Sequence, residues 1–129
     1  MITFEQLEKK EEQIAVVGLG YVGLPLAVLL AKHFSVIGYD VDAKKIAQLT
    51  AGEDKTGEVS QAELKEAHIT YTTNPEALKN AKYIIISVPT PIDESNQPDL
   101  RTLKSATKTV AQHLQKGSIV VYESTVYPG

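Results

Sequence analysis

Short apolar runs alternate with longer amphipathic stretches along most of the chain. The apolar runs predict five strands, at residues 14–17, 35–39, 69–72, 83–88 and 119–122. The amphipathic stretches predict helices, at residues 21–32, 43–51, 61–67, 75–80 and 100–115. Strands that alternate with helices are typical of the α/β class, in which helices cover both faces of a parallel sheet. Right-handed crossovers then favour a Rossmann-type doubly wound sheet with the strand order 3-2-1-4-5.

Capping signals mark the ends of several predicted helices. Ser60 and Glu63 match a capping box, and Val59 and Leu64 are placed to form its hydrophobic staple. Further signals at helix ends are Gly52, Asn74-Pro75 and Asp99. The last predicted helix carries one apolar stripe, made of Leu100, Leu103, Thr107, Val110 and Leu114.

A glycine-rich turn, from Gly18 to Gly23, joins the first predicted strand to the first predicted helix. Glycines at such a junction allow a pyrophosphate to approach the backbone, and the helix N-terminus offers free N–H groups to it. The second strand ends in Asp40, which follows Gly18 by 22 residues. An acid about 20 residues after the turn can accept the ribose hydroxyls. This order predicts a dinucleotide site, and the plainer alternative is a turn that packs a helix on the sheet without any ligand.

The turn suggests a role for each of its residues. Gly18, Gly20 and Gly23 would serve the turn itself, the pyrophosphate approach and the helix–strand packing, in that order. The backbone N–H groups of Tyr21 and Val22 would meet phosphate oxygens, whereas the side chains of these two residues could simply belong to the core.

Asp40 indicates which dinucleotide the turn would bind. A carboxylate at the ribose repels a 2′-phosphate, so NAD is favoured over NADP. Lys44 and Lys45 soften that preference, because nearby cations can tolerate a phosphate. The plainer interpretation of Asp40 is a solvated strand end, although the glycine turn upstream favours the ribose role.

Composition excludes several classes of protein. The chain has 129 residues, 43% of them hydrophobic and 22% charged, as expected for one globular domain. Its net charge of −3 argues against nucleic acid or an anionic membrane as a partner. It contains no cysteine, and its three histidines fit no catalytic or metal-binding pattern, so we assign no metal site. Without a signal peptide or a long apolar stretch, we expect a soluble, cytoplasmic protein.

Five short motifs, in order along nearly the whole chain from Ile14, resemble the UDP-glucose/GDP-mannose dehydrogenase family. They are GLGYVGLPLA, GYDVD with Lys45, SVPTP, PDL and ESTVYPG. The combination is far more specific than the glycine turn alone. VPTP together with ESTVYPG looks most like the branch that acts on UDP-N-acetylhexosamines and feeds capsule or O-antigen polysaccharides.

The resemblance implies an NAD-dependent oxidation of a UDP-sugar. The C6 alcohol passes through an aldehyde to a uronic acid and uses two NAD. Family members carry the catalytic cysteine, lysine and asparagine, a helical middle region and a second nucleotide-binding domain downstream of the segment seen here. We therefore expect residues 1–129 to be the NAD-binding domain of a longer, homo-oligomeric dehydrogenase, truncated after the fifth strand and inactive alone. Such a truncation would leave apolar surface near strand five and allow self-association through it.

Four further residues are candidates for the cofactor site: the resemblance places Lys45, Glu123 and Thr125 there, and Thr90 is suggested by its position just after the fourth strand. Lys45 matches a basic family position near the adenosine, although it could be a solvated helix lysine. Thr90 lies between two prolines that restrict its backbone, so its hydroxyl could reach the ribose–nicotinamide half or be a plain turn residue. Glu123 and Thr125 would lie by the nicotinamide as candidate catalytic residues, with Thr125 positioning the substrate or a water. Both could instead be solvated residues at a strand end.

Two other functions remain open from the residues. One is a non-catalytic module that binds or senses NAD. The other is a different hydride-transfer enzyme, of the 6-phosphogluconate or 3-hydroxyacid dehydrogenase type. The VPTP and ESTVYPG segments favour the nucleotide-sugar dehydrogenase over this last class.

Overall fold

A central parallel sheet organises the chain in the computed structural model, which describes residues 13–20, 22–54, 57, 59–88, 100–114 and 117–123. Its strands are β1 (Gln13–Val17), β2 (Ser35–Tyr39), β3 (Ile69–Thr72), β4 (Ala81–Ile86) and β5 (Ile119–Tyr122). Its helices are α2 (Gly23–Ala31), α3 (Ala43–Thr50), α4 (Gln61–Glu66), the 3₁₀-helix η1 (Pro75–Asn80) and α5 (Arg101–His113). All neighbouring strands pair in parallel in the order β3-β2-β1-β4-β5, so the predicted fold class and strand order are confirmed.

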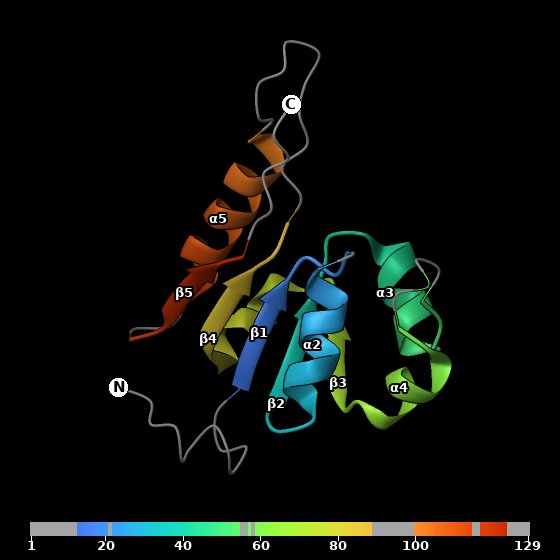
Figure 1. Ribbon diagram of the computed structural model, residues 1–129. Coiled ribbons are helices and arrows are strands. Elements are labelled where there is room, and N and C mark those ends of the chain that lie inside the picture. The colour runs from blue at the N-terminus through green and yellow to red at the C-terminus, as the bar shows by residue number, and fades with distance from the viewer. Residues whose placement is uncertain are drawn as a thin grey trace.

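Each face of the sheet has its own core because successive strand residues point to opposite faces. Val16 of β1 packs with Leu24 of α2, together with α3 and α4. Its neighbours Ala15 and Val17 pack on the other face, with η1 and Val110 of α5. Figure 1 shows α2 in front of the sheet, α3 and α4 beyond β3, and α5 at the opposite end beside β5.

Most predicted boundaries agree with the structure, and the differences have local causes. β4 runs from Ala81 to Ile86, whereas its apolar letters predicted 83–88, because Ala81 already pairs with Gln13 of β1 across a register shift. The segment after Asn74 forms a 3₁₀-helix of six residues. The Ser60–Glu63 capping box is confirmed, with reciprocal hydrogen bonds at both residues.

Helix α5 is shorter and more exposed than predicted. It begins at Arg101 with Leu100 as its N-cap, a residue that has no capping oxygen, and Asp99 lies outside the described residues. It ends at His113, because Leu114 has an extended backbone. Within the predicted stripe Val110 is buried, whereas Leu100 and Leu114 are exposed. The spacing of the apolar residues therefore predicts which face of α5 turns to the sheet. It does not predict that the two ends of this face stay exposed.

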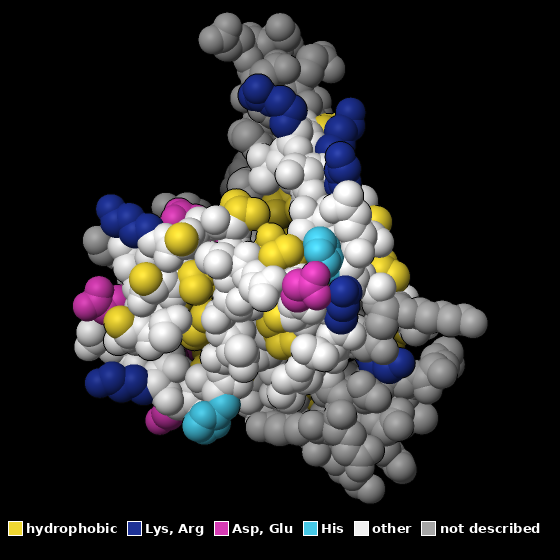
Figure 2. All heavy atoms as spheres, turned by 180° about the vertical axis from the view of Figure 1, so that it is seen from behind, with side chains coloured by type: hydrophobic (Ala, Val, Ile, Leu, Met, Phe, Trp, Pro, Cys, Tyr) yellow, Lys and Arg dark blue, Asp and Glu magenta, His cyan; other side chains and the backbone are white. Residues whose placement is uncertain are grey.

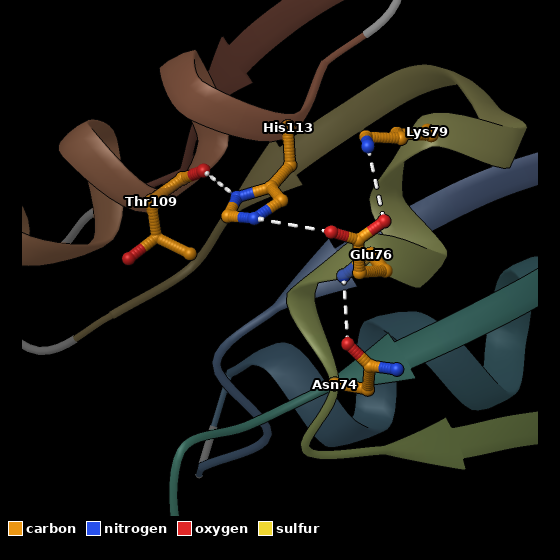
Figure 3. A network of polar contacts seen from close by, with 5 residues as sticks. All are labelled: Asn74, Glu76, Lys79, Thr109 and His113. Carbon is orange, nitrogen blue, oxygen red and sulfur yellow. Dashed lines mark hydrogen bonds and ion pairs between the residues drawn. The ribbon is translucent and has the colours of Figure 1, made fainter.

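A polar network fastens α5 to η1 on the face opposite α2 (Figure 3). Asn74 caps η1 by accepting the N–H of Glu76, and Lys79 forms a 3.0 Å ion pair with the Glu76 carboxylate. The hydrogen bond and charge of Lys79 lower the pKa of Glu76. His113 meets the Thr109 carbonyl through Nδ1 at 2.9 Å and lies 4.0 Å from Glu76 through Nε2. When protonated, His113 of α5 would form an ion pair with Glu76 of η1.

Candidate dinucleotide-binding site

Four residues follow four neighbouring strands at one edge of the sheet. The N–H of Gly18 donates to Tyr39 O at 2.8 Å, and that of Asp40 donates to Thr72 O at 3.2 Å. Beyond β4 and β5, Ser87 N donates to Val17 O at 2.7 Å and Glu123 N to Ile86 O at 2.9 Å. The ladder thus continues one residue past each strand, and it fixes Asp40, Gly18, Ser87 and Glu123 in a row where doubly wound sheets bind ligands.

The three glycines of the turn have different surroundings. Gly18 has a φ of +97°, and a Cβ there would overlap the Ser87 carbonyl oxygen. A Cβ at Gly23 would overlap the Gly18 carbonyl oxygen, so helix and turn are in direct backbone contact. Gly20 has nothing within 4 Å of an added Cβ, which leaves open space above the turn. Gly18 and Gly23 therefore lie in close backbone contacts, whereas the space beside Gly20 is open, and the roles of the three glycines toward a pyrophosphate stay predictions.

Helix α2 presents its N-terminus at this open space. Val22 is its N-cap and provides no side-chain hydrogen bond, and the first turn contains no acidic residue. Pro25 lies within this first turn, where its missing N–H costs no intrahelical bond. The first turn therefore faces the site without a side chain of the helix neutralising its positive end. Tyr21 lies outside the described residues.

Asp40 lies directly against the glycine turn. Its Oδ2 accepts the N–H of Leu19 at 2.9 Å, and its Oδ1 accepts the N–H of Asp42 at 2.9 Å. Burial, followed by the charge of Asp40, raises the pKa of the neighbouring Tyr39. The structure thus brings the predicted acid and the predicted turn together through a hydrogen bond.

Lys45 lies in the first turn of α3, close in sequence to Asp40. Its N–H donates to Oδ1 of Asp42, which caps α3, and its side chain is half-buried. Glu123 is exposed at the end of β5. Thr90 and Thr125 lie outside the described residues, so the roles of these four residues stay predictions.

Ser87 is a residue of the site that sequence reasoning missed. It is 5% exposed, and its hydroxyl has no hydrogen-bond partner among the described residues. Its carbonyl oxygen lies against Gly18, and its Cβ lies 3.4 Å from the position of a Cβ at Gly23. The signal in the sequence is a hydroxyl at the end of the apolar run Tyr83–Ile86, directly before VPTP.

Two hollows lie away from this row. A groove of about 540 Å³ follows α5 and Tyr122 of β5, and another of about 450 Å³ lies between α3, α4 and β3. Tyr71 lines the second, and burial, followed by the charge of Asp54, raises its pKa to about 12. Within the described ranges, no cluster of His, Asp and Glu could hold a metal ion, and no helix is long and apolar enough to cross a membrane.

The fold and the row of strand-end residues define a Rossmann-type dinucleotide-binding domain. Residues 12–129 match the model of the UDP-glucose/GDP-mannose dehydrogenase family, NAD binding domain. The chain belongs to this family, and NAD is the cofactor of the matched domain, which confirms the resemblance and the cofactor expected from the sequence.

Several proteins are similar to this chain over most of its length. The chain is 53% identical over 116 residues to Protein CapL of Staphylococcus aureus, an alignment that covers 90% of this chain and 27% of that protein. It is 52% identical over 121 residues to a UDP-N-acetyl-D-glucosamine 6-dehydrogenase of Pseudomonas aeruginosa, covering 93% of this chain and 29% of that protein. A solved UDP-D-ManNAc dehydrogenase from Pyrococcus horikoshii superposes with a TM-score of 0.81 at 37% identity, over 91% of this chain and 29% of that one. The chain thus spans less than a third of the length of these relatives.

Proposed function

We propose that this chain supplies the NAD-binding domain of a UDP-sugar 6-dehydrogenase that acts on a UDP-N-acetylhexosamine. The substrate class comes from the names of the relatives and from the motifs VPTP and ESTVYPG. The sugar-binding part and the catalytic cysteine would come from polypeptide outside residues 1–129. A homo-oligomeric state and a cytoplasmic location belong to the same proposal.

One observation carries the cofactor assignment: open space at Gly20 lies beside a carboxylate that is hydrogen-bonded to the same turn. The backbone at Gly20 and the N-terminus of α2 would receive the pyrophosphate. Asp40 would accept the ribose hydroxyls and repel a 2′-phosphate, which favours NAD over NADP. When bound, NAD accepts the hydride from the sugar.

Thr90, Glu123 and Thr125 would complete the nicotinamide end. Glu123 supports this placement because its backbone is fixed in the same row as Gly18 and Ser87. Thr90 and Thr125 follow β4 and β5 by a few residues in the sequence, so we propose both hydroxyls for the nicotinamide side.

Calorimetric titration of the chain with NAD and with NADP tests the cofactor assignment. We expect binding of NAD, weaker binding of NADP and a smaller difference between the two in Asp40→Ala. Gly20→Val should abolish NAD binding and keep the melting temperature, because the new side chain enters the open space rather than the core. Ala62→Val on the exposed face of α4 is the matched control and should bind NAD normally. Normal binding by Gly20→Val, or tighter binding of NADP by the unaltered chain, would overturn the assignment.

A second experiment tests where the sugar chemistry lies. Oxidation of an aldehyde to an acid needs a covalent adduct from which a hydride can leave, and a thiolate is the fitting nucleophile. The chain has no cysteine, so we expect no sustained NADH production from NAD and UDP-N-acetylhexosamines. Sustained turnover above a control without protein would contradict this part of the proposal.

A further inference from the structure

We propose that Asp40 has a second role: it positions the glycine-rich turn on which the pyrophosphate would lie. One carboxylate would then connect the ribose end and the phosphate end of the cofactor site. The inference rests on the proposed NAD site and deepens it.

The direct observation is the hydrogen bond between Asp40 and the backbone of the turn. Asp40 Oδ2 accepts the N–H of Leu19, the residue between Gly18 and Gly20, at 2.9 Å. The preceding N–H, that of Gly18, donates to Tyr39 O at 2.8 Å. Two successive amides of the turn are therefore held by two successive residues at the end of β2.

Leu19 is the right residue to hold if the turn is to keep its shape. Its side chain is 1% exposed and packs in the core formed with Val16 and Leu24. Packing in the core thus holds the Leu19 side chain, and the hydrogen bond to Asp40 holds its backbone amide. These two restraints would fix the backbone that leads into Gly20, the residue with open space beside it.

The carboxylate has enough capacity for both roles. An ionised carboxylate offers about four acceptor sites on its two oxygens. Leu19 takes one on Oδ2 and Asp42 takes one on Oδ1, which leaves roughly one on each oxygen for a ribose hydroxyl. Binding the ribose therefore does not require Asp40 to release the turn.

The two roles differ in which ligands depend on Asp40. If Asp40 only received the ribose, a ligand without ribose hydroxyls would bind equally well with or without its carboxylate. If it also positions the turn, the same ligand still loses affinity when the carboxylate is removed. The comparison forms a double-mutant cycle in which one of the two changes is made in the ligand.

The test compares NAD with an analogue that lacks both hydroxyls of the adenosine ribose. Calorimetry would measure both ligands on the unaltered chain, on Asp40→Ala and on the control Ser60→Ala, which removes a helix cap on α4 away from the turn. We expect Asp40→Ala to lose about tenfold in affinity for the dideoxy analogue, as for one lost charge-assisted hydrogen bond. Ser60→Ala should bind it normally. Equal affinity of Asp40→Ala and the unaltered chain for the analogue would overturn the second role.

Amide hydrogen exchange gives an independent measurement that needs no ligand. The Leu19 amide should exchange at least about tenfold faster in Asp40→Ala than in the unaltered chain, because alanine offers this N–H no acceptor. In Ser60→Ala its rate should stay the same. An unchanged Leu19 rate in Asp40→Ala would contradict the proposal. If the unaltered chain bound no NAD, the proposed function would fail, and this exchange rate would still decide the role of Asp40.

Discussion

Helices α2 and α5 cover opposite faces of one sheet, yet they differ in how deeply they are buried. In α2, with nine residues, the buried positions are Gly23, Leu24, Ala27, Val28 and Ala31. In α5, with thirteen residues, the one buried residue is Val110. Small residues let α2 approach the sheet and the glycine turn closely, whereas the apolar residues of α5 lie partly above the sheet.

The strands beneath the two helices show the same contrast. β1, under α2, is buried from Ile14 to Val17, while Val121 and Tyr122 of β5 are 42% and 50% exposed. The end of β5 is therefore covered much less than β1. Figure 2 shows the face that carries α5, with basic side chains gathered over the upper part of this face. The glycine turn and Asp40 thus rest on the closely packed half of the sheet, whereas Glu123 follows the exposed strand β5.

The largest effect should come from breaking the contact between α2 and the turn. In Gly23→Val the new side chain would overlap the Gly18 carbonyl, a backbone atom that cannot move aside. We expect a loss of at least about 4 kcal/mol in the free energy of unfolding, measured by urea titration. The control is Gly20→Ala, which meets nothing within 4 Å and should stay within about 1 kcal/mol of the unaltered chain. A small loss in Gly23→Val would mean that α2 can lift off the turn.

Truncation of one leucine in each helix measures the contrast directly. Leu24 of α2 is 1% exposed, and Leu103 of α5 is only partly buried. Leu24→Ala should lower the free energy of unfolding by about 3 kcal/mol. Leu103→Ala should lower it by about half as much, because Leu103 buries less apolar area on folding. Equal losses in the two variants would show that α5 is held as firmly as α2.

Alkaline pH should lower the free energy of unfolding through Tyr71, which packs against the core formed with α2. Its pKa rises from 10.0 to about 12, mainly because burial disfavours the phenolate. This contribution to stability is therefore complete below pH 10 and is lost as the pH rises through about 12. Urea titrations between pH 9 and 12 should show a steeper fall for the unaltered chain than for Tyr71→Phe, with pH 7 as the common reference. The same pH dependence of stability in both proteins would show that folding does not raise the pKa of Tyr71.

Two serines should give the smallest effects, with opposite signs. The buried hydroxyl of Ser87 lacks a partner, so Ser87→Ala should leave the free energy of unfolding unchanged or raise it by up to about 1 kcal/mol without cofactor. The matched control is Ser118, whose hydroxyl donates to Ala81 O at 3.1 Å between β5 and β4. Ser118→Ala should lower stability by about 1 kcal/mol. A loss in Ser87→Ala would mean that its hydroxyl is bonded in solution.

Much of this fold follows from local patterns, because apolar runs and caps depend on neighbours in the sequence. β2, β3 and β5 begin and end where their apolar runs do, and the Ser60 capping box forms as expected. The order of strand, turn and helix, together with the spacing, predicted the glycine turn and Asp40 as a site. Neither could show that Asp40 accepts the Leu19 N–H. Ser87 and the exposed ends of α5 were missed because tertiary neighbours decide burial. The hydrophobic pattern of one segment does not show which distant segments will pack against it.

The bonds that fix the turn also limit where an anion can sit. The N–H groups of Gly18 and Leu19 already donate to Tyr39 and Asp40, so neither is available to a phosphate. The donors must come from Gly20 onward, up to the first turn of α2, because the N–H of Leu24 already bonds Gly20 O. A pyrophosphate in the proposed site would therefore lie nearer to the N-terminus of α2 than to the end of β1. In the proposed site, the adenosine would then lie toward Asp40 at the end of β2 and the nicotinamide toward the ends of β4 and β5.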